Sequence, residues 1–163
     1  MRIRMKEAAA RMFAYINKTY IPEIDQITNT KTVLLCQPME SSANEWKLYS
    51  LIDNSLIASF VLADMPGCCG ISISTQANVY PKFRNRGLGL LLNRVRIDIA
   101  TQLGYGLLIC TSLEMSDPQQ KILKHNGWSK LLSFRNPRTN NVVCLHAIEL
   151  HKNYEALLKG EYK

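Results

Sequence analysis

The residues most suited to ligand chemistry lie at positions 79–89, where a strand-like segment enters a glycine-containing turn that opens into an amphipathic helix. The first N–H groups of a helix have no partner within it, and the helix dipole favours negative charge there. Gly87 and Gly89 let the backbone approach a ligand closely, and Arg84 and Arg86 add positive charge. These features together predict a phosphate-binding site at the N-terminus of the helix.

Two common phosphate-binding motifs do not account for this turn. Leu92 stands where the dinucleotide motif G-x-G-x-x-G has its third glycine, and the chain contains no G-K-[S/T] sequence of a P-loop. The segment R-x-x-G-x-G at residues 84–89 is preceded by V-x-P at residues 79–81 and by Phe83. In this form it resembles the acetyl-CoA-binding motif of the GNAT superfamily of N-acetyltransferases.

The resemblance extends beyond the motif, because the order of elements from residue 32 to residue 150 is similar to that of the superfamily. The N-G-W junction at residues 126–128 is similar to the family's step from a helix into its sixth strand. The L-K-x-x-G pattern at residues 123–127 is also similar to some GNAT-like proteins of bacteriophages.

The resemblance implies that acetyl-CoA is the acyl donor and indicates where it would bind. The pantetheine arm would pair with the backbone of Ala77 and Val79 like an additional strand, and the N–H groups of residues 84–89 would hold the pyrophosphate. Ser116 falls where the family often has an asparagine that contacts the pantetheine. The implied cofactor-binding residues are Ala77, Asn78, Val79, Arg84, Asn85, Arg86, Gly87, Leu88, Gly89 and Ser116.

The acid and base that many family members use are absent. Leu123 occupies the position of the tyrosine that protonates the departing CoA thiolate. In place of a glutamate base, the strand at 71–79 offers Ser72, Ser74, Gln76 and Asn78. A thiolate is a good leaving group because its conjugate thiol has a pKa of about 8.5, so the absence of the usual acid and base is tolerable. The catalytic residue is therefore unknown.

The candidates for catalysis are Glu114, His125 and Tyr80. Glu114 follows the strand at 106–111 near the expected acceptor mouth, Tyr80 lies beside the motif, and His125 lies near the end of a helix as a candidate general base. His125 also has a structural interpretation, as a residue that stabilises the end of a helix, and Tyr80 has one as an ordinary packing aromatic. Asp117 is interpreted as a helix cap and Cys110 as a small buried hydrophobe.

The net charge of +7 is distributed unevenly along the chain. Residues 1–81 hold 7 basic and 7 acidic side chains, whereas residues 82–163 hold 13 basic and 6 acidic ones. A basic second half favours an anionic partner. The predicted function is transfer of an acetyl group from acetyl-CoA to an amine, an anionic acceptor being favoured, by direct attack in a ternary complex. The alternatives are a nucleic-acid-modifying acyltransferase and a catalytically inactive acyl-CoA-binding or structural protein.

Length and composition indicate one globular domain, residues 1–163, which is expected to act as a monomer or homodimer. No apolar run is long enough to span a membrane, and no secretory signal is recognised. The five cysteines are an odd number without a C-x-x-C pair, which favours the cytoplasm and no metal site.

The elements expected to position the motif are a helix at residues 6–20 ended by Pro22, strands at 32–37, 46–52 and 56–62, and a turn at 53–55. They continue with the strand at 71–79, a helix at 88–103, a strand at 106–111, a helix from residue 117 to 126, strands at 128–134 and 142–150, and a closing helix at 153–158. A family-type first strand would have to lie in residues 1–5. The cofactor core covers about residues 70–135 and the C-terminal hairpin and tail cover 128–163. The expected fold is an α/β domain with a GNAT-like mixed, mostly antiparallel sheet, helices on both faces and a splayed central strand pair.

Overall fold

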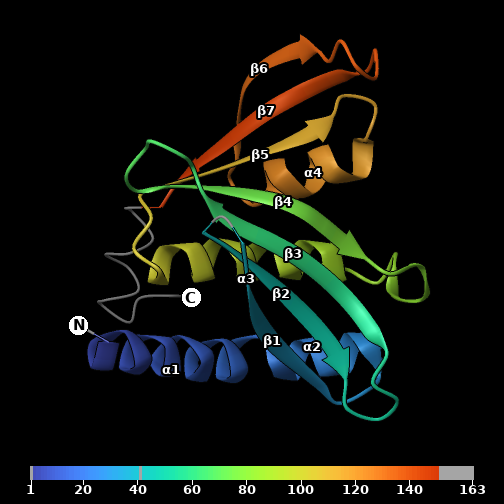
Figure 1. Cartoon of the computed structure of the whole chain (residues 1–163). Helices are drawn as coiled ribbons and strands as arrows, with labels where there is room; N and C mark the ends of the chain where they lie inside the picture. Colours follow the sequence, from blue (N-terminus) through green and yellow to red (C-terminus); the bar gives the residue numbers. More distant parts are fainter. Residues whose placement is uncertain (1, 41, 151–163) are drawn as a thin grey trace.

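The computed structural model describes residues 2–40 and 42–150, and the side chains from residue 9 onward within those ranges. Its seven strands form one mixed sheet in the order β1-β2-β3-β4-β5-β7-β6 (Figure 1). The elements are α1 (Arg2–Thr19), α2 (Ile21–Thr28), β1 (Thr32–Met39), β2 (Ala43–Ser50), β3 (Leu56–Asp64), β4 (Ile71–Val79), a 3-10 turn (Pro81–Phe83), α3 (Leu88–Gln102), β5 (Leu107–Leu113), α4 (Asp117–His125), β6 (Ser129–Arg135) and β7 (Val142–Glu149). The expected α/β architecture with a mixed sheet is confirmed.

The N-terminal part differs from the expectation in two ways. Pro22 does not close a helix, because α1 is followed at once by α2 and Pro22 lies in the first turn of α2. The first turn is where a helix needs no N–H donor, so proline is accepted there. The strand expected within residues 1–5 is wrong for residues 2–5, which belong to α1. The helix expected at 153–158 lies outside the described residues.

Strands β1 to β4 form an antiparallel series, and α3 then carries the chain across to β5. β4 and β5 are parallel, as expected for a right-handed crossover, but they pair only from Ile71 with Leu107 to Ser74 with Cys110. The remainder of β4 has no partner on β5, while β5 pairs along its whole length with β7. The two central strands therefore splay apart, as expected.

A bulge in β4 strengthens this divergence. Between the pairs Ser59–Asn78 and Val61–Thr75, β4 has one residue more than β3. Gln76 takes up the additional length with a positive φ of 52°. Bulges bend and twist the strand that carries them. The outer half of β4 is thereby directed away from β5.

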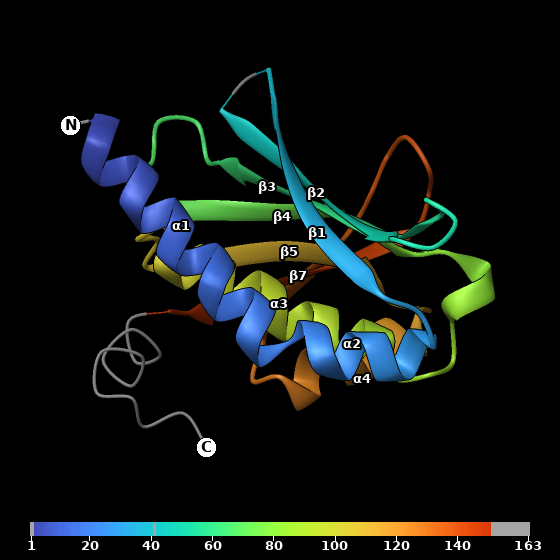
Figure 2. The same ribbon diagram turned by 90° about the horizontal axis from the view of Figure 1, so that it is seen from below.

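The helices gather on one face of the sheet, which corrects the expectation of helices on both faces. Trp46 of β2 is the register partner of Phe60 of β3, so the two side chains share a face. Trp46 contacts Phe13 of α1 with ring centroids 5.6 Å apart, and Phe60 lines the same cavity as Leu92 of α3. Figure 2 shows α1, α2, α3 and α4 together on one side of the sheet, in the lower part of the view, with β1 to β5 above them. The order of helices and strands along the chain does not specify on which face of the sheet each helix packs, whereas these contacts do.

The main hydrophobic core lies between this helical layer and the sheet. Met12 and Ile16 of α1, Val95 and Ile99 of α3, and Leu108 of β5 all belong to one buried cluster. Helix α3 is buried on most of its circumference, since α1, α2, α4 and the sheet all contact it. Within the described residues, no helix is long and apolar enough to cross a membrane.

Candidate functional site

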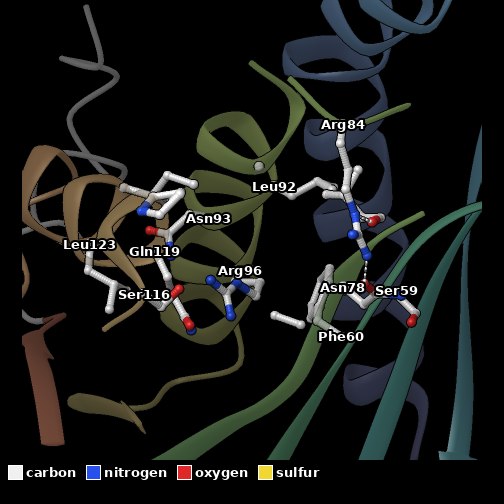
Figure 3. Close-up of a pocket in the computed structure, with 15 residues that line it drawn as sticks. Ser59, Phe60, Asn78, Arg84, Leu92, Asn93, Arg96, Ser116, Gln119 and Leu123 are labelled. Atoms are coloured by element: carbon white, nitrogen blue, oxygen red, sulfur yellow. Dashed lines mark hydrogen bonds between the residues drawn. The ribbon is translucent and has the colours of Figure 1, made fainter. Parts of the chain in front are cut away.

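A cavity of about 360 Å³ lies where β4 and β5 separate, and it is lined from β3, the outer half of β4, α3 and α4 (Figure 3). The tip of β4 contributes Ala77, Asn78 and Val79. Helix α3 contributes one side of the cavity, and the residues from Ser116 to Leu123 contribute the opposite side. The splayed strands and the two helices thus form one hollow that begins beside the N-terminus of α3.

The turn between β4 and α3 leaves the N-terminus of α3 without a hydrogen-bonding cap from a side chain. Asn85 and Gly87 both have positive φ values, of 60° and 85°, and Gly87 is the N-cap of α3 without any side-chain cap. Arg84 folds back onto the strand: its Nε donates to the Val79 carbonyl oxygen at 2.6 Å and its Nη2 to Asn78 Oδ1 at 3.2 Å. The backbone N–H groups of residues 85–89 have no acceptor among the described residues. The free N–H groups and the helix dipole make this end of α3 suitable for an anion.

Six of the ten cofactor-binding residues expected from the sequence line the cavity: Ala77, Asn78, Val79, Arg84, Gly89 and Ser116. Asn85 and Gly87 lie on the adjacent turn. The Leu88 side chain is buried in the core at 1% exposure, so only its backbone is available to a ligand. Arg86 is directed elsewhere, into a separate hollow that it shares with Lys82 and Asp53.

Close packing of α3 against α4 depends on Gly89. A Cβ atom at this position would lie 3.2 Å from Cδ1 of Ile122 on α4. Because both residues line the cavity, a larger side chain at position 89 would press on α4 and narrow the hollow at the same time.

Four polar residues of the cavity lining were not expected there from the sequence: Ser59 of β3, Gln119 of α4, and Asn93 and Arg96 of α3. Asn93 Oδ1 accepts from Trp128 Nε1 at 3.0 Å and from Asn126 Nδ2 at 2.9 Å, while its own Nδ2 has no partner. Arg96 Nη1 donates to Ser74 Oγ at 2.9 Å. For Asn93 and Arg96 the signal was present, since positions 89, 93 and 96 follow helical spacing and so share the face of Gly89. The apolar stripe of the helix expected at residues 88–103 does not by itself show that polar residues of this helix line the cavity.

The structure does not bring the three catalytic candidates to the cavity, which none of them lines. Glu114 Oε1 lies 3.5 Å from the Lys130 ammonium. His125 lines a different hollow, which it shares with Arg94 and Asp98 from the middle of α3. Tyr80 is 37% exposed on the turn after β4. Leu123 does line the cavity, so a leucine stands there rather than a proton donor.

A buried polar network next to the cavity ties α4 to the sheet. Gln120 Nε2 donates to Ser112 Oγ at 2.8 Å, and Ser112 Oγ lies 2.9 Å from His146 Nε2. Burial, and secondarily the positive charge of Lys130, lowers the pKa of His146. These contacts give His146 a structural role between β5 and β7.

Cys110 and a group of three lysines lie outside the cavity lining. Burial raises the pKa of the Cys110 thiol to about 11, which makes it a poor nucleophile. Lys121, Lys124 and Lys130 surround a separate hollow of about 390 Å³ with Trp128. In the described part of the chain, no group of three or more His, Cys, Asp or Glu residues is placed to hold a metal ion.

No protein-family model matches the sequence, and no curated protein matches it in sequence. Solved structures match its architecture. Spermidine/spermine N-acetyltransferase SpeG from Vibrio cholerae aligns with a TM-score of 0.66 at 9% identity, over 79% of this chain and 98% of that chain. IAA acetyltransferase from Bacillus cereus aligns with a TM-score of 0.64 at 14% identity, over 73% of this chain and 99% of that chain. A protein described as a GNAT-family acetyltransferase, from Desulfovibrio desulfuricans, aligns at 0.60 and 15% identity over 67% and 69%.

The chain has the GNAT fold. Among the described strands, β4 and β5 are the one parallel pair, and the cavity lies beside the splay of this pair, with strand residues of β3 and β4 in its lining. In this GNAT fold the cavity and the free N-terminus of α3 lie at the splayed end of the central strands, on the face that carries the helices.

Proposed function

We propose that this protein is an acyl-CoA-dependent N-acyltransferase that transfers an acetyl-type group to an amine. The observation that carries the proposal is the free N-terminus of α3 at the entrance of the cavity. There the N–H groups of residues 85–89 have no acceptor among the described residues. An anion-binding helix end that opens into a slot between splayed strands suits a donor with a diphosphate at one end and a thioester at the other.

The donor would bind along β4. Beyond Ser74 this strand has no partner on its β5 side, so an extended amide-containing arm can pair with the backbone from Ala77 to Val79. Asn93 Nδ2, a buried donor without a partner, lies in the same lining and suits an amide carbonyl of that arm. The unpaired strand edge and the unpaired amide therefore both fit a pantetheine arm.

Transfer would occur by direct attack of the acceptor. The amine nitrogen attacks the thioester carbonyl carbon, the C–N bond forms and the C–S bond breaks. The sulfur leaves as a thiolate with the bonding electron pair, and the nitrogen releases its proton to solvent. A backbone N–H of β4 would stabilise the developing oxyanion. With Leu123 in the lining, the rate would come mainly from orientation and from the good leaving group.

The first test is a thermal-shift and calorimetric titration with CoA and acetyl-CoA. A donor that binds only the folded state stabilises it by about 2.7 kcal/mol at roughly 100 times its Kd. An acceptor screen then follows thiol release from acetyl-CoA, with small amines, amino acids and peptides. Absence of stabilisation by any CoA species would contradict the proposal.

Leu123 also supports a second candidate, a protein that binds acyl-CoA without turnover, because the cavity has no proton donor at that position. Binding of acetyl-CoA without thiol release on any acceptor would favour this candidate. The three lysines around the separate hollow, Lys121, Lys124 and Lys130, support a nucleic-acid acceptor for the enzyme. Salt-dependent retention of RNA or DNA, lost when these lysines are changed to glutamine, would identify that acceptor.

A further inference from the structure

Arg96 is a charged residue buried at the side of the proposed donor cavity. It is 7% exposed, and its single hydrogen bond joins Nη1 to Ser74 Oγ at 2.9 Å. It forms no ion pair with any described carboxylate, and the residues that line the cavity include no aspartate or glutamate. Figure 3 shows its guanidinium between Gln119 of α4 and Phe60 of β3.

A buried guanidinium without a counter-ion is energetically unfavourable. Desolvation lowers the pKa of Arg96, but arginine still remains protonated at physiological pH. Of its five N–H donors, those other than the one facing Ser74 have no acceptor among the described residues. An apolar residue would fill the same place at lower cost, as do its neighbours Leu92 and Leu123. The charge is therefore best explained by a ligand anion.

The position of Arg96 indicates which part of a ligand it meets. It lies eight residues beyond Leu88, about 12 Å along α3 from the free helix end. Its partner Ser74 is the last residue of β4 that pairs with β5, so Arg96 lies at the closed end of the gap between the strands. A donor with its diphosphate at the N-terminus of α3 would extend its acyl group toward this closed end.

The cavity thus has a positive group at each end, with the N-terminus of α3 and Arg84 at the mouth and Arg96 at the closed end. We propose that the preferred donor is an acyl-CoA whose acyl group ends in a carboxylate, such as succinyl-CoA, and that Arg96 binds this carboxylate. The planar fork of arginine suits a carboxylate bound by two hydrogen bonds. This inference rests on the proposed function and adds the class of acyl group.

A carboxylate could also reach Arg96 from an amino-acid acceptor. The donor is favoured because its acyl group continues from a chain already directed along β4 toward Ser74. Binding experiments without any acceptor separate the two sources.

The experiment compares succinyl-CoA with butyryl-CoA by calorimetry, because the two acyl chains have the same length and differ in charge. In the wild type, succinyl-CoA is expected to bind at least about 10-fold more tightly than butyryl-CoA. In Arg96→Met this preference should disappear while CoA itself still binds. The matched control is Arg94→Met, which removes an exposed cation from the same helix and should keep the preference. Arg96→Lys keeps the charge without the fork and serves where Arg96→Met does not fold; it should reduce the preference.

Each other outcome overturns a defined statement. Equal affinity of the wild type for the two donors would overturn this inference and leave the proposed function standing if CoA binds. Failure of CoA itself to bind would overturn both. A preference that survives in Arg96→Met would overturn the role of Arg96. Equal donor affinities together with Arg96-dependent binding of a carboxylate-bearing amine, measured with acetyl-CoA present, would assign Arg96 to the acceptor instead.

Discussion

Gly87 combines two properties at the residue scale, a left-handed backbone and an uncapped helix end. Its φ is +85°, and a Cβ placed on it would meet no atom within 4 Å. In Gly87→Asp we expect the fold to survive with a strain of about 1–2 kcal/mol. The new carboxylate would occupy the free N–H groups of α3 and repel a diphosphate. CoA affinity should fall by roughly 100-fold or more, as measured by calorimetry.

Gly104 provides the matched control for this change. Its φ is +86°, it also has no atom within 4 Å of an added Cβ, and it follows the other end of α3. Gly104→Asp should therefore show backbone strain of similar size while CoA binding stays as in the wild type. If both variants retained CoA binding, the phosphate site would have to lie elsewhere.

At the scale of single elements, the sequence predicted most of what shapes the cavity. The period-two alternation at 71–79 and the glycine turn gave β4 and the start of α3 at their observed bounds. The inner face of α3 was harder to predict. Asn93 and Arg96 are polar, which suggests exposure, but the packing of α3 in the fold buries both of them. Pro22 was misinterpreted for a related reason, since proline fits the first turn of a helix as well as the segment that follows one.

The junction of α3 with α4 depends on Asn93, which is fully buried and accepts from both Trp128 Nε1 and Asn126 Nδ2. Asn93→Ala would leave these donors without their acceptor, so we expect the free energy of unfolding to fall by about 1–3 kcal/mol. Urea denaturation followed by tryptophan fluorescence measures this loss. Gln102→Ala is the control on the same helix, because Gln102 Nε2 is buried without a partner and its removal should cost less. A loss in Asn93→Ala no larger than in Gln102→Ala would contradict the role of this junction.

At the scale of the whole molecule, the four helices of the described residues lie on one face of the sheet. The face opposite the helices presents side chains such as Ile73 and Ile109 that are only partly buried. Strand patterning could not reveal this, because a central strand covered on one face and half-covered on the other has nearly the same composition as one covered on both. The uneven charge along the chain was easier to interpret, since part of the basic surplus lies on the turn between β4 and α3.

Alkaline pH should loosen two long-range contacts of this layered structure. The Tyr15 hydroxyl on α1 donates to Asp98 Oδ2 on α3 at 3.1 Å, and the Tyr105 hydroxyl donates to Asp64 at the end of β3. Burial, together with the nearby carboxylate, raises the pKa of each tyrosine to about 12. An unfolded tyrosine has a pKa of about 10, so the unfolded state loses these protons first. The stabilisation is therefore complete below about pH 10 and is lost as pH rises toward about 12.

Two measurements check this expectation on the wild type and on single variants. Absorbance titration of tyrosinate should show a late group near pH 12 that is smaller in Tyr15→Phe and in Tyr105→Phe. Thermal unfolding should show that the wild type loses more stability between about pH 9 and about pH 11.5 than either variant does, because each variant lacks one of the two linked protons. Tyr49→Phe is the matched control, since the Tyr49 hydroxyl has no hydrogen-bond partner among the described residues, and its loss of stability should parallel that of the wild type. If the two variants and the wild type lost stability in parallel, the contacts of Tyr15 and Tyr105 would not be the alkaline-sensitive ones.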